Sequence, residues 1–362
     1  MIGYAVGMMT SPLRAGLFAL AVATGSATIV HAQPGFGPGQ RVLVDAHNCY
    51  PEGDAYADRI DRALATGLPV AIEQDLVWRP ATDGRPAHSI VSHGEPFTGR
   101  EPSLRQHFFE RIRPLVEAAL RDGDRRQWPL ITLNLDFKSV EPEHLAEIWA
   151  VLGEFEAWLT TAPRTATPDQ PAPLDVRPVL VLTGDHPEQQ AAFHDRVPVG
   201  GRLRLFGAIL LRPDEWMEAR LGKNADRDVA RRAFWTALRD LPLPSATNYR
   251  RWWNNAWWVV EGASQPKAGD WSPEEDARLK ALVKKSHAAG LWIRYYTLNG
   301  HGADVKRGWT DSYNFGSPAA AETRWRAAIA AGVDFIATDQ YEDVARTLTR
   351  KEPPTPQRDQ GA

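Results

Sequence analysis

Short apolar segments alternate with longer amphipathic stretches along most of the chain. The apolar segments are rich in Val, Ile and Leu, and eight of them occur, at residues 41–48, 69–78, 130–138, 177–184, 205–211, 256–261, 291–299 and 333–339. Such runs, separated by long crossovers, are typical of parallel strands buried on both faces. Eight of them predict an α/β protein with a single (β/α)8 TIM-type barrel.

The stretches between these segments predict the outer helices of the barrel. They cover residues 54–66, 104–121, 143–160, 214–241, 273–289 and 319–331, and a glycine follows several of them, at Gly67, Gly123, Gly290 and Gly332. Glycine is the residue that most readily ends a helix. The barrel is therefore expected over residues 41–349, after a linker at 33–40 and before a disordered polar tail at 350–362.

The amino-terminal 32 residues have the layout of a secretory signal peptide. Arg14 is their one charged side chain, the apolar run 15–30 follows it, and small residues surround the expected cleavage after Ala32. This pattern predicts a secreted or periplasmic protein from which residues 1–32 are removed. An uncleaved amino-terminal anchor is the alternative, and no later apolar segment has the length of a membrane span.

Composition excludes some partners and narrows the role of the single cysteine. Lys and Arg number 42 against 45 for Asp and Glu, giving a formal charge of -3. Nucleic acid is therefore not expected as a partner, because the chain has no excess of basic residues to attract it. Cys49 is the only cysteine, which excludes an internal disulfide. We expect it to be a buried thiol, because no base is obviously paired with it.

Two carboxylates interrupt the second apolar segment near its end. Glu73 and Asp75 are two residues apart, so in a strand both side chains lie on the same face. In a parallel barrel the carboxyl ends of the strands carry the functional side chains. Two like charges held side by side repel each other unless a cation neutralises them. A solvated strand end is the alternative, and a metal site is the more specific prediction.

The third apolar segment adds a further carboxylate. Asn134, Asp136 and Lys138 alternate there with apolar residues, so one face of this strand is polar. We expect the polar face to line the barrel near its mouth, with Asp136 as a third metal ligand and Lys138 near the substrate or the acids. Three carboxylates without cysteine or paired histidines suit a hard cation, Mg2+ or Ca2+.

Two histidines lie at the ends of apolar segments close to these acids. His47 ends the first segment, and His93 follows the short apolar run 89–92 after the second. Cleavage of a phosphodiester needs one group to take a proton and another to give one, and two imidazoles can share these roles. His88 is the alternative to His93, which we prefer because it follows the apolar run.

The ordered set of these residues resembles the phospholipase C-like phosphodiesterase superfamily, which includes the glycerophosphodiester phosphodiesterases. The matching segments are His47, Glu73-Gln74-Asp75, His93, Asp136, Tyr296-Thr297-Leu298-Asn299 and the closing Gly332 to Asp339. The segment Ala46 to Tyr50 is most similar to the branch with a His-Asn-Asp-Tyr motif. The resemblance implies that His47 and His93 form the catalytic pair and that Glu73, Asp75 and Asp136 bind the metal. It also implies a small-molecule or lipid-headgroup phosphodiester as substrate, either phospholipid-derived or of the glycerophosphodiester type.

The sequence departs from the family pattern in two places. Glycerophosphodiesterases carry a further Glu ligand after the first His at a different spacing, so Glu52 stays an open candidate. The separation of Asp75 and His93 is also longer than usual, which keeps His88 open.

An unusual density of Trp and Asn at residues 250–258 predicts that one or two of Trp252, Trp253 and Asn255 line the substrate cleft. With Asn48, Tyr296 and Asn299 from the matched motifs, Trp253 and Asn255 complete the expected substrate-binding residues. Lys138 is grouped with the catalytic histidines as a charge-balancing side chain.

Other functions remain as alternatives. An amidohydrolase would have a second His two residues after His47, where this chain has Cys49. A retaining glycosidase would have two Glu residues at strand ends about 5 Å apart. A barrel that binds an anionic ligand without turning it over is the alternative outside the enzymes.

Overall fold

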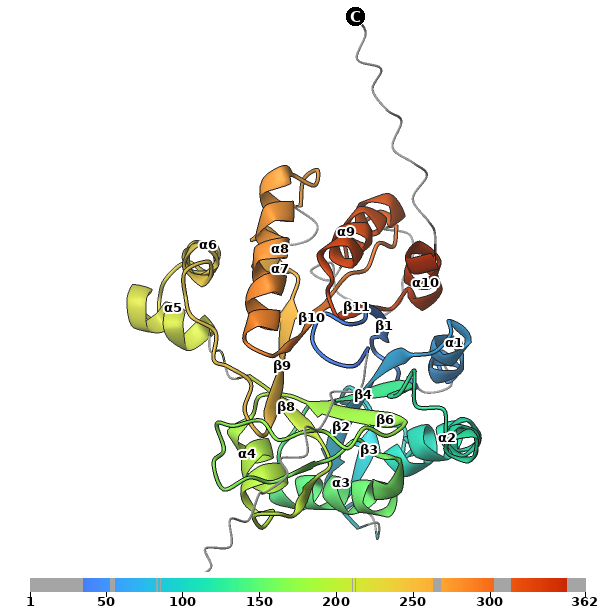
Figure 1. The fold of residues 1–362 in the computed structure, drawn as a ribbon. Coiled ribbons are helices and arrows are strands. Elements are labelled where there is room, and N and C mark those ends of the chain that lie inside the picture. The colour runs from blue at the N-terminus through green and yellow to red at the C-terminus, as the bar shows by residue number, and fades with distance from the viewer. Residues whose placement is uncertain are drawn as a thin grey trace, which may run out of the picture. The chain divides into compact units, whose positions relative to one another are not determined.

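The structure is a computed structural model that describes residues 35–52, 56–82, 84, 86–209, 211, 213–262, 268–302 and 314–349. The predicted signal peptide and the tail at 350–362 lie outside these residues. The main sheet has the order β1-β11-β10-β9-β8-β6-β4-β2-β3, and a further pairing of β1 with β2 closes it. Eight parallel strands thus form a barrel, with β3 as an antiparallel neighbour of β2 outside it (Figure 1). The predicted TIM-type barrel is confirmed.

The strands and helices alternate as the sequence pattern predicts. The barrel strands are β1 (Leu43–Ala46), β2 (Val70–Arg79), β4 (Ile131–Phe137), β6 (Val179–Thr183), β8 (Phe206–Ala208), β9 (Arg250–Ala256), β10 (Trp292–Tyr296) and β11 (Phe335–Thr338). Outside the barrel lie β3 (His88–Val91) and the small pair β5 (Ala162–Pro163) and β7 (Arg202–Leu203).

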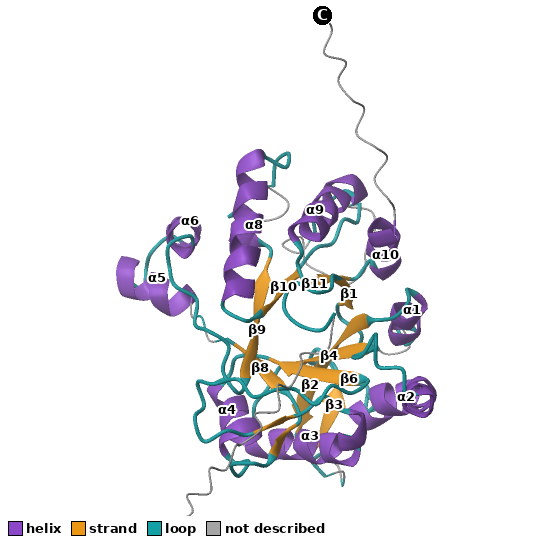
Figure 2. Ribbon diagram, viewed as in Figure 1, coloured by secondary structure: helices purple, strands orange, loops and turns teal. Residues whose placement is uncertain are grey.

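Helices surround the barrel, as Figure 2 shows in purple around the orange strands. They are α1 (Arg59–Ala65), α2 (Glu110–Asp122), α3 (Pro142–Glu154), α4 (Pro187–Gln190), α5 (Pro213–Leu221), α6 (Arg227–Leu238), α7 (Trp258–Glu261), α8 (Pro273–Ala288), α9 (Pro318–Ala331) and α10 (Tyr341–Thr349). Short turns of π- or 3-10 helix, Arg105–Phe109, Glu156–Trp158 and Ala191–Asp195, adjoin α2, α3 and α4. None of the helices in the described ranges is both long and apolar enough to cross a bilayer.

Local sequence signals explain where the longest helices begin and end. Ser272 caps α8 by accepting a hydrogen bond from the Glu275 backbone, and the Glu275 side chain bonds back to Ser272. Proline occupies the first turn of α8, where its missing N–H costs nothing. At the end of α9, Gly332 has φ of 78°, the left-handed conformation that glycine adopts without steric cost.

The sixth predicted strand is wrong in its position. Residues 256–261 were expected to form it, but the strand is β9, which ends at Ala256, and the apolar run after it forms the short helix α7. The polar residues of β9 make its sequence resemble a loop. One of them, Asn254, faces the barrel interior and accepts a hydrogen bond from Arg294. The helix predicted at 214–241 is also divided, into α5 and α6, with Gly222 at φ of 84° between them.

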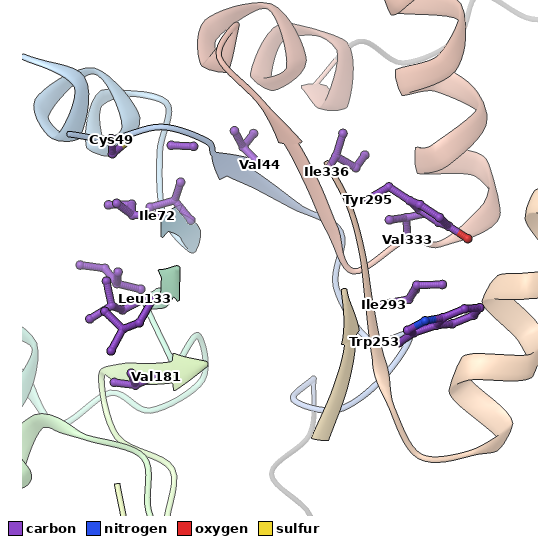
Figure 3. Close-up of a cluster of buried hydrophobic side chains, with 14 of the residues drawn as sticks. Val44, Cys49, Ile72, Leu133, Val181, Trp253, Ile293, Tyr295, Val333 and Ile336 are labelled. Carbon is purple, nitrogen blue, oxygen red and sulfur yellow. The ribbon is translucent and has the colours of Figure 1, made fainter. Parts of the chain in front are cut away.

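Two hydrophobic layers hold the barrel together. The larger one lies between strands and helices and includes Val44, Ile72, Trp253, Ile293 and Ile336 (Figure 3). The smaller one fills the barrel interior and is built from the alternate strand residues, among them Ala71, Leu180, Trp252, Trp292 and Phe335. Because these belong to the amino-terminal halves of their strands, the remaining interior positions toward the carboxyl ends are free for polar side chains.

Two buried histidines outside the barrel interior make stability depend on pH. Burial lowers the pKa of His107 and of His144 to about 4. As the pH falls, these two histidines bind protons first in the unfolded chain, where the pKa of histidine is near 6.5. Their contribution to the free energy of unfolding is therefore complete above about pH 6.5 and is lost toward pH 4. We expect a loss on the order of 2–4 kcal/mol in the free energy of unfolding between pH 7 and pH 5, measured by urea titration.

The variant His107→Gln should flatten this dependence, because it removes one titrating group while keeping a donor for the Cys49 carbonyl, which lies 3.1 Å from His107 Nε2. His186→Gln is the matched control, because the His186 side chain is 52% exposed. Equal pH dependence in all three proteins would contradict the assignment.

Candidate active site at the barrel mouth

Strand register brings the three predicted acids together. Glu73 pairs with Asn134 and Asp75 pairs with Asp136 across the parallel strands β2 and β4. One carboxylate oxygen from each of Glu73, Asp75 and Asp136 lies within 4.8 Å of the others. Glu73 and Asp75 are buried, whereas the Asp136 side chain is 44% exposed. The cluster therefore opens to solvent on its Asp136 side.

Asp75 is the least satisfied of these acids. Both of its carboxylate oxygens are buried without a hydrogen bond, and Lys138 Nζ lies 3.3 Å from Oδ2. Burial raises the pKa of Asp75 well above its usual range, and the Asp136 and Glu73 carboxylates raise it further. A buried carboxylate without donors is costly unless a cation neutralises it, and three converging oxygens are the donor set of Mg2+ or Ca2+. The residues present fit such an ion.

Lys138 supplies a permanent positive charge at the rim of this cluster. Its ammonium donates to Asp136 Oδ2 at 2.7 Å. Burial alone would lower the pKa of Lys138, but Asp75 and Asp136 outweigh it and raise the pKa above the usual value. Lys138 is shared by Asp75 and Asp136, so one ammonium does not balance these two carboxylates when both are ionised.

Glu73 forms an ion pair with a second cation, Arg294. Arg294 Nη2 on β10 lies 3.2 Å from Glu73 Oε1, and Arg294 Nε donates to Asp45 on β1. Asn134 Nδ2 also donates to Glu73 Oε1, at 3.2 Å. Burial opposes ionisation of Glu73, but Arg294 and His47 outweigh burial and lower the pKa of Glu73 to about 2. Glu73 is therefore ionised and held in one orientation.

His47 is oriented by the last barrel strand. Its Nδ1 lies 3.3 Å from Asp339 Oδ1, and its Nε2 lies 3.4 Å from Glu73 Oε2. Asn299 fixes Asp339 in turn, donating from Nδ2 to Asp339 Oδ2 at 2.8 Å and accepting from the Asp339 backbone N–H. Burial would lower the pKa of His47, but Glu73 and Asp339 outweigh it and raise the pKa to about 9.

Asn48 links the same groups through an unusual backbone conformation. Its φ of 57° is left-handed, a region that Asn tolerates better than most residues. This conformation directs the Asn48 N–H to Glu73 Oε2 at 3.2 Å and its side-chain amide to Asp339 Oδ1 at 3.0 Å. Asn48 thus supports His47 and Glu73 from the loop after β1.

His93 lies two residues after the end of β3. The preceding Ser92 donates its N–H to the Asp75 carbonyl at 3.0 Å, and the His93 ring lies 5.8 Å from that of Tyr50. Partial burial and then Lys138 lower the pKa of His93. His88 pairs with Arg79 at the far end of the hairpin, and its Nδ1 contacts the Pro86 carbonyl instead.

The remaining predicted residues are divided between the mouth and its surroundings. The Tyr296 ring stacks on His47 with centroids 6.3 Å apart. Trp253 and Asn255 point to the helix side of β9, where they border a cavity of about 250 Å³ that Tyr296 also lines. Glu52 is exposed and is not part of the carboxylate cluster.

Asp45, Arg294 and Asp339 were missed as part of the site by the sequence analysis. Arg294 had a usable signal, because a charged residue in the middle of a buried apolar strand needs a buried partner. Asp339 ends the last strand, where a functional carboxylate is expected in this fold. Asp45 gave no such signal, because its alternation with His47 resembles that of an ordinary strand end.

No family model matches the chain, and no curated protein matches it. Among solved structures, a glycerophosphoryl diester phosphodiesterase from Parabacteroides distasonis is similar with a TM-score of 0.39 and 13% identity, covering 85% of this chain and 86% of that one. One from Agrobacterium tumefaciens has a TM-score of 0.35 and 13% identity over 85% and 98% of the chains. The dihydropteroate synthase of Thermus thermophilus has a TM-score of 0.38 and 12% identity, covering 86% of this chain and 92% of that one. Both kinds of enzyme match similarly, so the likeness does not distinguish between their activities.

Proposed function

We propose that the protein is an exported phosphoric diester hydrolase that requires a divalent cation. The observation that carries this proposal is the buried Asp75 carboxylate, which lacks hydrogen bonds and lies beside Glu73 and Asp136. Glu73, Asp75 and Asp136 would hold Mg2+ or Ca2+. When bound there, the ion would supply positive charge toward the phosphate oxygens during cleavage. Export remains a proposal from the amino-terminal sequence.

The chain's own residues suggest how the protons are handled. Asp339 and Asn48 keep the His47 ring oriented, with Nε2 toward the acids. We assign the second role to His93, so that one imidazole takes the proton of the attacking oxygen and the other protonates the departing alkoxide. The phosphorus–oxygen ester bond breaks, releasing an alcohol. The second product is a phosphomonoester if water attacks, or a cyclic phosphate if a substrate hydroxyl attacks.

Lys138 adds charge balance at the same place. Its ammonium is fixed between Asp75 and Asp136 and is partly exposed, so it reaches the side from which a phosphodiester would enter. A fixed cation there stabilises the charge that develops on phosphate oxygens in the transition state.

The test is turnover of bis(p-nitrophenyl) phosphate with Mg2+ or Ca2+. We expect EDTA to abolish it and His47→Ala to lower kcat by about 10²–10³-fold, because a positioned acid or base contributes that much. His186→Ala, at an exposed residue, is the control and should be fully active. Absence of turnover on any phosphodiester, with cation and an anionic ligand bound, would instead indicate the non-catalytic binding barrel.

A further inference from the structure

A cavity of about 250 Å³ adjoins the candidate site and is lined by Asn254 and Tyr296, among other residues. It lies at the carboxyl ends of β6, β8 and β9, beneath α6. Two of the residues that line it also contact the catalytic groups. The Tyr296 ring stacks on His47, and Asn254 accepts a hydrogen bond from Arg294, which in turn contacts Glu73. These two shared residues make the cavity a direct neighbour of the catalytic groups.

Most of the residues that line the cavity are apolar, and the polar ones are Asp185, Asn254, Asn255 and Tyr296. Ile209 and Leu211 line it from the segment after β8, Phe234 and Leu238 from α6, and Val259 from α7. Helix α6 is fastened in this position, because the Phe234 ring packs 6.0 Å from that of Trp258 and Trp235 Nε1 donates to the Val260 carbonyl at 3.0 Å. The apolar wall is thus a packed part of the fold.

Two polar groups of the cavity already have hydrogen-bond partners within the protein. The Asn254 carbonyl is bonded to Arg294, and the Asn255 amide donates to the Trp253 carbonyl at 3.4 Å. Asp185 is the only charged side chain among the described lining residues. A hydroxyl-rich group such as glycerol would find only these few polar partners, whereas an alkyl chain or ring would contact the apolar residues that form most of the wall.

We propose that this cavity binds the apolar part of one alcohol of the phosphodiester, a short alkyl chain or a single ring. An apolar cavity of about 150 Å³ holds benzene, so this one has room for roughly six to eight carbon atoms. The inference rests on the proposed phosphodiesterase function and narrows its substrate class. Phosphodiesters with an apolar alcohol are preferred over those whose two alcohols are both polar.

The experiment compares hexyl glyceryl phosphate with methyl glyceryl phosphate, which share the phosphate and the glycerol. Loss of diester is followed by phosphorus NMR with Mg2+ or Ca2+ present. We expect kcat/KM for the hexyl ester to exceed that for the methyl ester by at least about 10-fold, because the longer chain buries five more methylenes. Phe234→Ala should reduce this ratio severalfold.

Two further variants keep the test independent of folding defects. Leu211→Asn changes a half-buried loop residue of the wall and should also reduce the ratio. Val229→Ala lies on the same helix as Phe234, but Val229 is 48% exposed, so the ratio should not change. Equal kcat/KM for both esters in the unaltered protein would overturn the cavity assignment and leave the phosphodiesterase standing.

Calorimetric binding of hexyl phosphate and methyl phosphate separates the two proposals. If neither ester is turned over but hexyl phosphate binds at least about 10-fold tighter, and Phe234→Ala removes the difference, the phosphodiesterase is wrong and the cavity remains an apolar subsite beside an anion site. If neither ester is turned over and both phosphates bind equally, both proposals are overturned.

Discussion

Asp75→Asn is expected to abolish phosphodiester turnover, by about 10³-fold or more, without lowering the stability of the cation-free protein. The carboxylate is buried and accepts no hydrogen bond, so it contributes a ligand but little internal stabilisation. Its raised pKa favours the neutral form when no cation is bound, and Asn copies that form in shape. The loss of activity follows because one of three ligands is removed.

Thermal unfolding provides a measurement that does not depend on activity. A cation at 100 times its dissociation constant stabilises the folded state by about 2.7 kcal/mol, which raises the unfolding midpoint by several degrees. We expect Mg2+ or Ca2+ to produce this rise in the unaltered protein and not in Asp75→Asn. Asp169→Asn, at an exposed loop residue, should retain both the rise and the activity. An undiminished rise in Asp75→Asn would refute the metal site.

Strand positions and the acids at their ends were predictable because they depend on local pattern. Alternation placed Glu73 and Asp75 on one face, and the rule that function gathers at the carboxyl ends of parallel strands placed Asp136 beside them. The structure brings these three acids together as the alternation requires. Their proximity follows from the register of β2 and β4 alone.

The supporting network was not predictable in the same way, because its partners come from opposite ends of the chain. Asp45 and Arg294 are separated by 249 residues, and His47 and Asp339 by 292. Only closure of the barrel makes them neighbours. The sixth strand was misplaced for a related reason, since its inward Asn254 is favourable only beside Arg294. A polar strand of this kind cannot be recognised before its partner strand is known.

The charged residues of the site form two groups, which we call the lower and the upper level. The lower level contains Arg294 with Asp45 and Glu73, and the upper level contains Lys138 with Asp75 and Asp136. At the lower level Arg294 contacts both Asp45 and Glu73, and His47 also faces Glu73, so these acids have cationic partners within the protein. At the upper level Asp75 and Asp136 share only Lys138. The upper level is therefore where an external cation gains most, and the lower level is where loss of an internal cation costs most.

Arg294→Gln is accordingly expected to be the most destabilising single change at the site. Removing this buried cation leaves Asp45 without its ion-pair partner and Glu73 with His47 alone, and breaking a buried pair typically costs about 3–5 kcal/mol of unfolding free energy, measured by urea titration. Activity should fall with it, because Glu73 loses the contact that orients it. The double variant Asp45→Asn with Arg294→Gln should recover part of the stability, since one uncompensated charge is removed. Arg126→Gln, which breaks an exposed pair with Asp124, should cause no measurable change. If Arg294→Gln lowered the free energy of unfolding no more than Arg126→Gln does, Arg294 could not be the cation that stabilises Asp45 and Glu73.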